Sequence, residues 1–298
     1  MTTDTLYQKR RRPAEAFLMA AIYGAASIAV LLLLGIIGYV FFKGFRVLSI
    51  EFLTTVTSSL KGTVGIAGNL LNTLYIIVIT LLIATPIGVG GAIYLNEYAK
   101  PGRLVNMIEF TTETLSGIPS VIFGLFGMVF FGNALGLGYS LLNGSLTLTL
   151  MVLPLIVRNT QEALRTVPDS YRSGALGMGA TKWYMIRTIL LPSAKPGILT
   201  GVILAVGRIV GESAALLFTA GSARILPKLG ESLTDNLSRI GGKILQPGGT
   251  LTIELYLQMQ NGEYEVAFGV GCVLIVIVLL INLLLKVITG NARKYGKQ

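Results

Sequence analysis

Residues 173–192 read SGALGMGATKWYMIRTILLP and lie inside residues 158–196, a basic interval between two strongly apolar segments. Small and apolar residues recur there at spacings of three and four, namely Leu176, Gly179, Trp183, Ile186 and Leu190. Such a stripe is typical of a helix that lies on a surface. Periodicity and charge leave two interpretations open: a loop held against anionic lipid headgroups, or a loop that binds a soluble partner protein.

The same interval contains signals that begin and end helices. Gly177 and Gly179 predict a break into two short helices, because each glycine in a helix interior costs about 1 kcal/mol relative to alanine. Thr181 is the expected N-cap of the second helix. Pro192 together with Pro196 is expected to end it.

The composition of the whole chain indicates a membrane protein. Of 298 residues, 53% are hydrophobic and only 13% are charged, and the mean hydropathy is +0.72, well outside the range of soluble domains. The chain has 24 Lys and Arg and only 14 Asp and Glu. In a membrane protein, such a surplus of basic residues indicates membrane orientation and contact with anionic lipid and not nucleic-acid binding. With no His and a single Cys, Cys272, the chain cannot form an internal disulfide or a His/Cys metal site, and we expect no cofactor.

Six apolar segments are long enough, or nearly so, to cross a bilayer. They are residues 17–42, 72–95, 107–131, 145–157, about 197–220 and 266–285. We therefore expect an all-α polytopic membrane protein of about six transmembrane helices, with the basic loop between helices four and five. The expected division is a cytoplasmic tail (1–16), a first membrane helix with an external loop (17–66), a membrane domain (67–290, containing the loop 158–196) and a cytoplasmic tail (291–298).

The positions of Lys and Arg predict the orientation. With both termini in the cytoplasm, the cytoplasmic side carries 16 Lys and Arg and the external side carries 7, and Arg208 lies within a span. This asymmetry agrees with the positive-inside rule. We therefore expect a multi-pass protein of a bacterial plasma membrane with both termini inside the cell.

Arg208 and Glu212 are the only ionisable residues inside a clearly apolar segment. Being four residues apart, they are expected on one helix face, directed toward the bundle interior or a water-filled cavity. One interpretation is an ion pair that fixes helix packing. The other is an anion path, in which the Arg208 guanidinium contacts an oxyanion and Glu212 positions it and weakens its grip. Glu109 and Glu113 are expected to anchor the cytoplasmic end of the third helix.

The spacing within the loop also resembles the EAA loop of binding-protein-dependent ABC importer permeases. Gly179 is followed after nine residues by Ile189, then after one residue by Leu191-Pro192, and Ala175 lies four residues before Gly179. In that family the loop docks into the cytoplasmic ATPase. The resemblance implies this role for Ser173, Gly174, Ala175, Gly179, Ala180, Thr181, Trp183, Ile189, Leu191 and Pro192. Two positions depart from the motif, because Ser173 replaces its usual Glu and Gly174 replaces its first Ala.

Wider stretches look like the phosphate importer permease, and specifically the second of its two related subunits. These are residues 72–74, 86–88, 117–120, 167–172, 179–183, 191–198 and 208–214. The resemblance covers about residues 68 to 290 and implies a permease subunit that conducts phosphate. It also implies three kinds of partner: a homologous permease, a cytoplasmic ATPase dimer and an external phosphate-binding protein.

Alternatives remain open from the sequence. A permease of the same architecture could carry another oxyanion, such as molybdate or sulfate. An intramembrane enzyme is disfavoured by the absence of His and of a paired intramembrane Asp. A membrane scaffold would leave a buried Arg unexplained. Gly241-Gly242-Lys243 lacks the other residues of a nucleotide-binding loop, so ATP hydrolysis is expected in a partner subunit.

Overall fold

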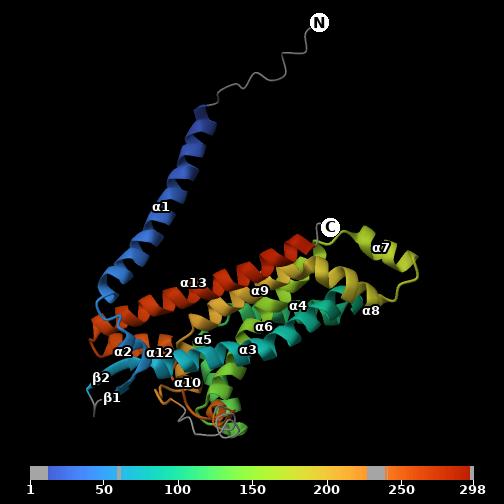
Figure 1. Ribbon diagram of the computed structural model, residues 1–298. Coiled ribbons are helices and arrows are strands. Elements are labelled where there is room, and N and C mark those ends of the chain that lie inside the picture. The colour runs from blue at the N-terminus through green and yellow to red at the C-terminus, as the bar shows by residue number, and fades with distance from the viewer. Residues whose placement is uncertain (1–12, 59–61, 227–238, 240, 296–298) are drawn as a thin grey trace.

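The computed structural model describes residues 13–58, 62–226, 239 and 241–295, and it shows a bundle of long helices with short elements at both ends (Figure 1). The long helical segments are α1 (Pro13–Gly44), α3 continued by the π-helix η1 (Ala67–Ile93 and Tyr94–Tyr98), α6 (Leu141–Arg165), α8 continued by the π-helix η3 and by α9 (Lys182–Met185, Ile186–Leu190 and Leu191–Val210), and α13 (Tyr264–Tyr295). The shorter elements are α2 (Ile50–Thr54), β1 (Val56–Ser58), β2 (Thr63–Ile66), α4 (Arg103–Gly117), α5 (Ser120–Gly127), the π-helix η2 (Met128–Ala134), α7 (Asp169–Gly177), α10 (Ala214–Thr219), the 3-10 turn η4 (Lys243–Leu245) and α12 (Leu251–Gln260).

Among the described residues, five helices are long and apolar enough to cross a membrane, and the total is six if the bent pair of α4 with α5 and η2 is counted as one span. This confirms the all-α membrane fold of about six spans, to which the structure adds one small antiparallel hairpin, β1–β2. Residues 13–16 and 291–295, which belong to the predicted tails, are helical. Residues 1–12 and 296–298 lie outside the described residues.

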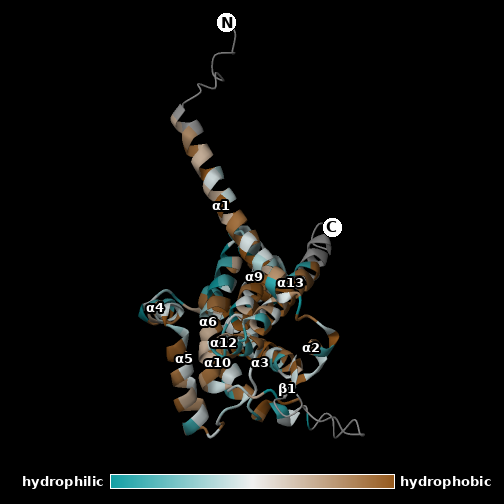
Figure 2. Cartoon of the chain, turned by 90° about the vertical axis from the view of Figure 1, so that its left-hand side faces the viewer, coloured by the Kyte–Doolittle hydropathy of each residue, from teal (hydrophilic) through white to brown (hydrophobic). Residues whose placement is uncertain are grey.

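The third apolar segment is not the continuous span that its composition suggests. α4 and the α5–η2 segment meet at 102°, and Figure 2 shows the polar α4 turning away from the apolar α5 at the edge of the bundle. Ile118 has extended torsions, φ −73° and ψ 131°. The cause is Pro119, since a proline ring clashes with a helical conformation of the residue before it.

α6 is the central helix and is longer than predicted. It begins after Ser140, whose side chain accepts a hydrogen bond from the Asn143 N–H at 3.2 Å, and 67% of its most apolar window is buried. Its ends carry polar side chains that the packing buries, which is why hydropathy alone placed them outside the span. α3 and α9 pack against it. Gly88 of α3 allows the close approach, because a Cβ there would lie 2.7 Å from Ile156 of α6.

α1 is the opposite case. No residue of its most apolar window is buried. In Figure 1 the C-terminal end of α1 meets α13, and the N-terminal part of α1 points away from the bundle. At the meeting point the Cys272 thiol donates to the Val40 carbonyl at 3.3 Å, and Gly44 lies against the backbone of Phe268. An apolar helix with no protein around it is suited to a lipid environment.

The fifth segment differs from its prediction at both ends. Pro192 and Pro196 do not end a helix, because Lys182–Val210 forms one continuous helical span. The π-turn Ile186–Leu190 precedes Pro192, and its wider hydrogen-bond spacing removes the need for the N–H that proline lacks. The span then ends at Val210 rather than at Ala220, and α10 begins as a separate helix.

Polar contacts hold the short elements at the end of the bundle where α3 begins. Asn69 and Asn72 of α3 both donate to the Gly249 carbonyl at 3.1 Å. Glu254 of α12 is 1% exposed and forms an ion pair with Arg224 at 2.6 Å. The amide of Gln258 donates to the same carboxylate at 2.6 Å. Residues 221–265, expected as a long polar stretch, thus contain a helix fixed by a buried charge.

We predict that Glu254→Gln lowers the stability of the folded protein by about 3 kcal/mol, because breaking one side of a buried ion pair leaves the other charge without compensation. Thermal unfolding in detergent, followed by fluorescence, measures the shift. Glu263→Gln is the matched control, since Glu263 is exposed and its loss should change stability by less than about 0.5 kcal/mol. Equal unfolding temperatures for the two variants would contradict the role given to Glu254.

Candidate functional site

The basic loop contains the predicted break, a tight turn between α7 and α8, but only α7 is a separate short helix, because α8 continues into the span that ends at Val210. α7 ends at Gly177, and Gly179 adopts φ +84°. The Gly179 N–H donates to the Leu176 carbonyl at 3.0 Å, and the Ala180 N–H donates to the Ala175 carbonyl at 3.1 Å. This pair of hydrogen bonds is a Schellman motif, which requires a left-handed residue at the position of Gly179. No atom lies within 4 Å of a Cβ built there, so torsion and not space demands the glycine.

The second helix begins where the sequence predicted. The Thr181 hydroxyl accepts a hydrogen bond from the Tyr184 N–H at 3.3 Å, which is the contact of an N-cap residue. The Lys182 ammonium lies 4.9 Å from the centre of the Tyr98 ring. This cation–π contact joins the start of α8 to the end of η1.

The predicted surface stripe does not lie on one face, and that prediction was wrong. Ile186 and Leu190 are fully buried, whereas Leu176 and Trp183 are 49% and 59% exposed. The exposed residues belong instead to a group of large apolar side chains on α7, the turn and α8. This loop patch consists of Tyr171, Leu176, Met178, Trp183 and Tyr184. Large exposed apolar side chains on one loop are candidates for an interaction surface.

The opposite face of the loop packs onto the bundle. Ala175, Met185, Ile186 and Leu190 share a core with Leu164 at the end of α6. Ala180, Ile189 and Leu191 are half-buried against this core. Of the other predicted docking positions, Ser173, Gly174 and Pro192 are exposed. The predicted residues therefore divide into an exposed set that a partner can contact and a buried set that holds the loop.

Ser173, which replaces the motif glutamate, turns inward on its own helix. Its hydroxyl donates to the carbonyls of Asp169 and Ser170 at 3.1 and 3.3 Å. These are contacts within α7. Ser173 therefore presents no charge at the exposed surface of the loop.

Arg172 is the residue that fixes the loop to two membrane helices, and the sequence prediction missed it. Its guanidinium pairs with Glu97 of η1 at 3.0 Å, and the two side chains are only 18% and 5% exposed. It also donates to the carbonyls of Leu164 and Val167 at 2.9 Å and to Asp169 at 3.0 Å. The sequence offered only a weak signal, because 75 residues separate Glu97 from Arg172.

Arg208 lies near the end of the same continuous helix that begins beside Thr181. Its side chain is exposed and lines a pocket of about 160 Å³. The other lining residues are Leu115, Ser116, Ile118, Phe123, Met151 and Leu155. Within the described residues no carboxylate lies within ion-pair distance of Arg208. Its one recorded contact is with the Met151 sulfur at 3.9 Å.

Glu212 does not pair with Arg208, so the predicted shared helix face and the ion pair are both wrong. The helix ends at Val210, and Glu212 follows the Gly211 C-cap. The Glu212 carboxylate is buried and accepts a hydrogen bond from the Ala215 N–H at 3.1 Å, where it complements the N-terminus of α10. The Glu212 carbonyl accepts from Thr252 at 2.8 Å. Glu212 therefore joins α9, α10 and α12.

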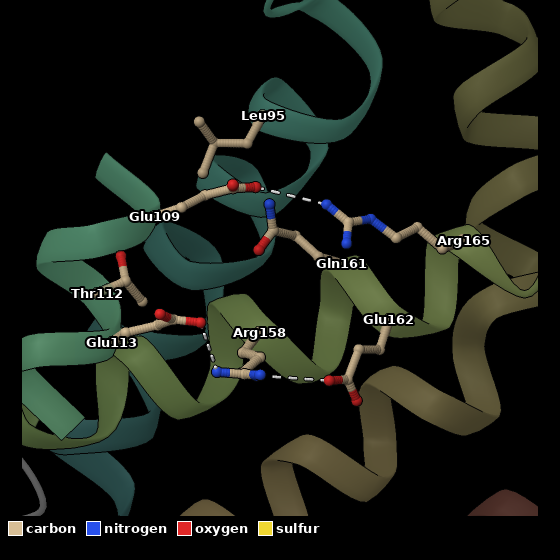
Figure 3. Close-up of a pocket in the computed structure, with 8 residues that line it drawn as sticks. All are labelled: Leu95, Glu109, Thr112, Glu113, Arg158, Gln161, Glu162 and Arg165. Carbon is tan, nitrogen blue, oxygen red and sulfur yellow. Dashed lines mark hydrogen bonds and ion pairs between the residues drawn. The ribbon is translucent and has the colours of Figure 1, made fainter. Parts of the chain in front are cut away.

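A second pocket, of about 140 Å³, lies between α4 and α6 and is shown in Figure 3. Glu113 contacts Arg158 at 3.2 Å, and Glu109 contacts Arg165 at 3.4 Å. α4 has no buried residue, so the ion pairs of Glu109 and Glu113 contribute to holding it against α6. Each pair is exposed and is worth less than about 1 kcal/mol. Gln161 lies behind them with its amide nitrogen unbonded to any described residue.

Lys243, in the segment before α12, is a buried cation. It is 1% exposed, and its ammonium donates to the Pro247 carbonyl at 3.3 Å. Burial lowers the pKa of this lysine. Lys243 therefore belongs to the turn η4 and contacts the chain just after it. It does not form part of a nucleotide-binding loop.

Comparisons with known proteins agree with this architecture. Residues 84–294 match the family model of the binding-protein-dependent transport system inner membrane component. The probable ABC transporter permease protein YqgI of Bacillus subtilis is 38% identical over 263 residues, covering 87% of this chain and 89% of the relative. The phosphate transport system permease protein PstA of Haemophilus influenzae is 38% identical over 184 residues, covering 62% and 65%.

A solved structure shows the same fold at low sequence identity. The crystal structure of a bacterial alginate ABC transporter with its periplasmic protein contains a chain that matches with a TM-score of 0.64 and 16% identity, covering 92% of this chain and 93% of that one. The family match spans well over half of the sequence. The chain therefore belongs to the binding-protein-dependent transport system inner membrane component family, as a multi-pass permease subunit of an ABC importer.

Proposed function

We propose that this chain is the phosphate-conducting permease subunit of an ATP-driven importer in a bacterial plasma membrane, with both termini in the cytoplasm. It forms half of the transmembrane path with a homologous permease. A cytoplasmic ATPase dimer binds the loop patch, and an external binding protein delivers inorganic phosphate. The similarity to PstA supports the substrate, and the observation that carries it is the unpaired Arg208 guanidinium beside an open pocket.

The loop patch supports ATPase docking. Its five large side chains are exposed together, while the opposite face of the loop is fixed by its core and by the Arg172–Glu97 pair. Interfaces are rich in Tyr, Trp and Met, and this patch contains all three. A rigidly supported patch transmits a partner's displacement instead of absorbing it.

The continuous helix from Lys182 to Val210 supports the coupling step. It contains 29 residues, which corresponds to a length of about 43 Å. Trp183 of the loop patch lies near its beginning and Arg208 near its end. ATP-driven closure of the ATPase dimer would tilt or shift this helix, and the pocket around Arg208 would move with it. Two discrete packings of the bundle then provide alternating access.

Arg208 supports phosphate as the conducted ion. A guanidinium presents a planar set of donors that matches phosphate oxygens, and an unpaired Arg inside a span is expected to face a path or a cavity. A single cation without further donors attracts an anion but releases it readily, which conduction requires. Tight selection is then left to the binding protein.

The proposed docking turn is tested by Gly179→Val. A non-glycine residue in the left-handed region costs about 1–2 kcal/mol, so the turn that orients the loop patch is lost and phosphate uptake should fall to a small residual. Uptake by proteoliposomes and the amount of inserted protein are measured together. The matched control is Gly177→Val, which places the same side chain where a Cβ meets no other atom but at helical torsions. Normal uptake by Gly179→Val would exclude the turn from coupling.

The proposed path is tested by Arg208→Gln. We expect phosphate flux to fall by about tenfold or more, since hydrogen bonds to charged groups contribute about 1.5–3 kcal/mol, while assembly with the ATPase is kept. Arg208→Lys should restore part of the flux. Arg187→Gln, at an exposed position of the same span, is the control. Failure of Arg208→Gln to assemble would show a structural role instead.

The substrate is tested by uptake of labelled phosphate into vesicles that contain this chain, its sister permease, the ATPase and the binding protein. We expect ATP-dependent uptake that excess sulfate or molybdate does not reduce. Competition by either oxyanion would favour a permease of the same architecture with a different substrate. An assembly that hydrolyses ATP but moves no phosphate would refute the phosphate assignment.

A further inference from the structure

A pocket between the end of α1 and the start of α13 contains charges that the transport mechanism does not use. Its volume is about 480 Å³. It is lined by four aromatic and three charged side chains, namely Tyr39, Phe42, Tyr264, Phe268, Lys43, Arg46 and Glu265. Among the described residues, Lys43, Arg46 and Glu265 form no ion pair. The pocket thus holds two free cations and one free carboxylate.

The position of the pocket is at a membrane surface. The candidate span of α1 ends at Gly44 and that of α13 begins at Tyr264, so the two helices cross the same boundary next to each other. Tyr39 and Phe268 pack edge to face with ring centres 5.6 Å apart. Tyr side chains with Lys or Arg beside them are typical of the headgroup level of a bilayer.

The shape of the site follows from the way α1 leaves the bundle. Gly44 and Val40 touch α13, whereas the rest of the helix toward its N-terminus diverges from it (Figure 1). This leaves a wedge with its charged end at the membrane surface and exposed apolar side chains such as Phe42 and Tyr39 along the membrane. An amphiphile with a charged head and acyl chains fits such a wedge.

We propose that this pocket binds a zwitterionic phospholipid with a primary ammonium, that is, phosphatidylethanolamine. Lys43 and Arg46 contact its phosphate, and Glu265 contacts its ammonium. A lipid with only a phosphate charge leaves the Glu265 carboxylate beside an anion without compensation. A quaternary ammonium cannot donate a hydrogen bond to that carboxylate. The carboxylate therefore selects the amine, and the aromatic walls hold the glycerol and the first acyl carbons.

The test uses the purified full chain with the subunits it assembles with. The complex is incubated in mixed micelles with equal amounts of phosphatidylethanolamine, phosphatidylglycerol and phosphatidylcholine, and retained lipid is counted by native mass spectrometry. We expect phosphatidylethanolamine to be retained preferentially. Glu265→Gln should reduce this preference by about threefold, the scale of one partly exposed ion pair. Lys43→Gln combined with Arg46→Gln should reduce retention of both phosphatidylethanolamine and phosphatidylglycerol.

Two matched controls isolate the site. Glu263→Gln removes an exposed carboxylate outside the pocket, and Lys100→Gln with Arg103→Gln removes two cations elsewhere. Both should leave retention unchanged. Equal retention of the three lipids, or an unchanged preference in Glu265→Gln, would overturn the proposal. So would displacement of the lipid by millimolar inorganic phosphate, or retention by the isolated chain but not by the complex, which would mean that a partner subunit covers the wedge.

Discussion

Within a bilayer, each backbone N–H and C=O group needs a partner inside the protein, because no water is present to replace one. The irregular parts of this fold follow from that constraint. Where the helix breaks after Val210, the Glu212 carboxylate accepts a hydrogen bond at the start of α10. At the beginning of α3, Asn69 and Asn72 donate to the carbonyls of an irregular segment more than 150 residues away. These polar side chains of an otherwise apolar chain thus form hydrogen bonds with backbone groups where the helices are interrupted.

The same constraint explains how a soluble partner could act on a buried path. A loop that merely lay on the membrane would move without moving the helices. Here Arg172 pairs with Glu97. Its guanidinium also donates hydrogen bonds to the carbonyls of Leu164 and Val167 at the end of α6. Displacement of the loop therefore reaches α3 and α6 through one side chain and reaches α9 through covalent continuity. The loop is part of the bundle rather than an attachment to it.

Much of the fold could be predicted from the sequence, because hydropathy reports directly on membrane spans. The turn at Gly179 and the cap at Thr181 were predictable because local torsions and local hydrogen bonds decide them. Contacts between distant segments were not. No local sequence pattern indicates the ion pair between Arg172 and Glu97. Arg208 and Glu212 are separated by the end of the helix at Val210, which the spacing of the two residues does not reveal.

Prolines were the least reliable signals, since their effect depends on the turn in front of them. Pro119 lies at the break where the third segment bends by 102°. Pro192 was assigned to a helix end and instead follows a π-turn inside a continuous helix. Both outcomes obey the same steric rule. The two sites differ in the residues before the proline, since Ile118 is extended and Ile186–Leu190 forms a π-turn.

The π-turn at Ile186–Leu190 also affects the direction in which side chains beyond it point around the helix axis. Each residue of an α-helix advances the side chains by about 100° around the axis, so the extra residue in that turn determines which way everything beyond it faces. The loop patch lies on one side of this turn and Arg208 on the other. Loss of the extra residue would leave both ends chemically intact, yet it would rotate the guanidinium away from its pocket. The orientation of Arg208 relative to the loop patch thus depends on the number of residues between them.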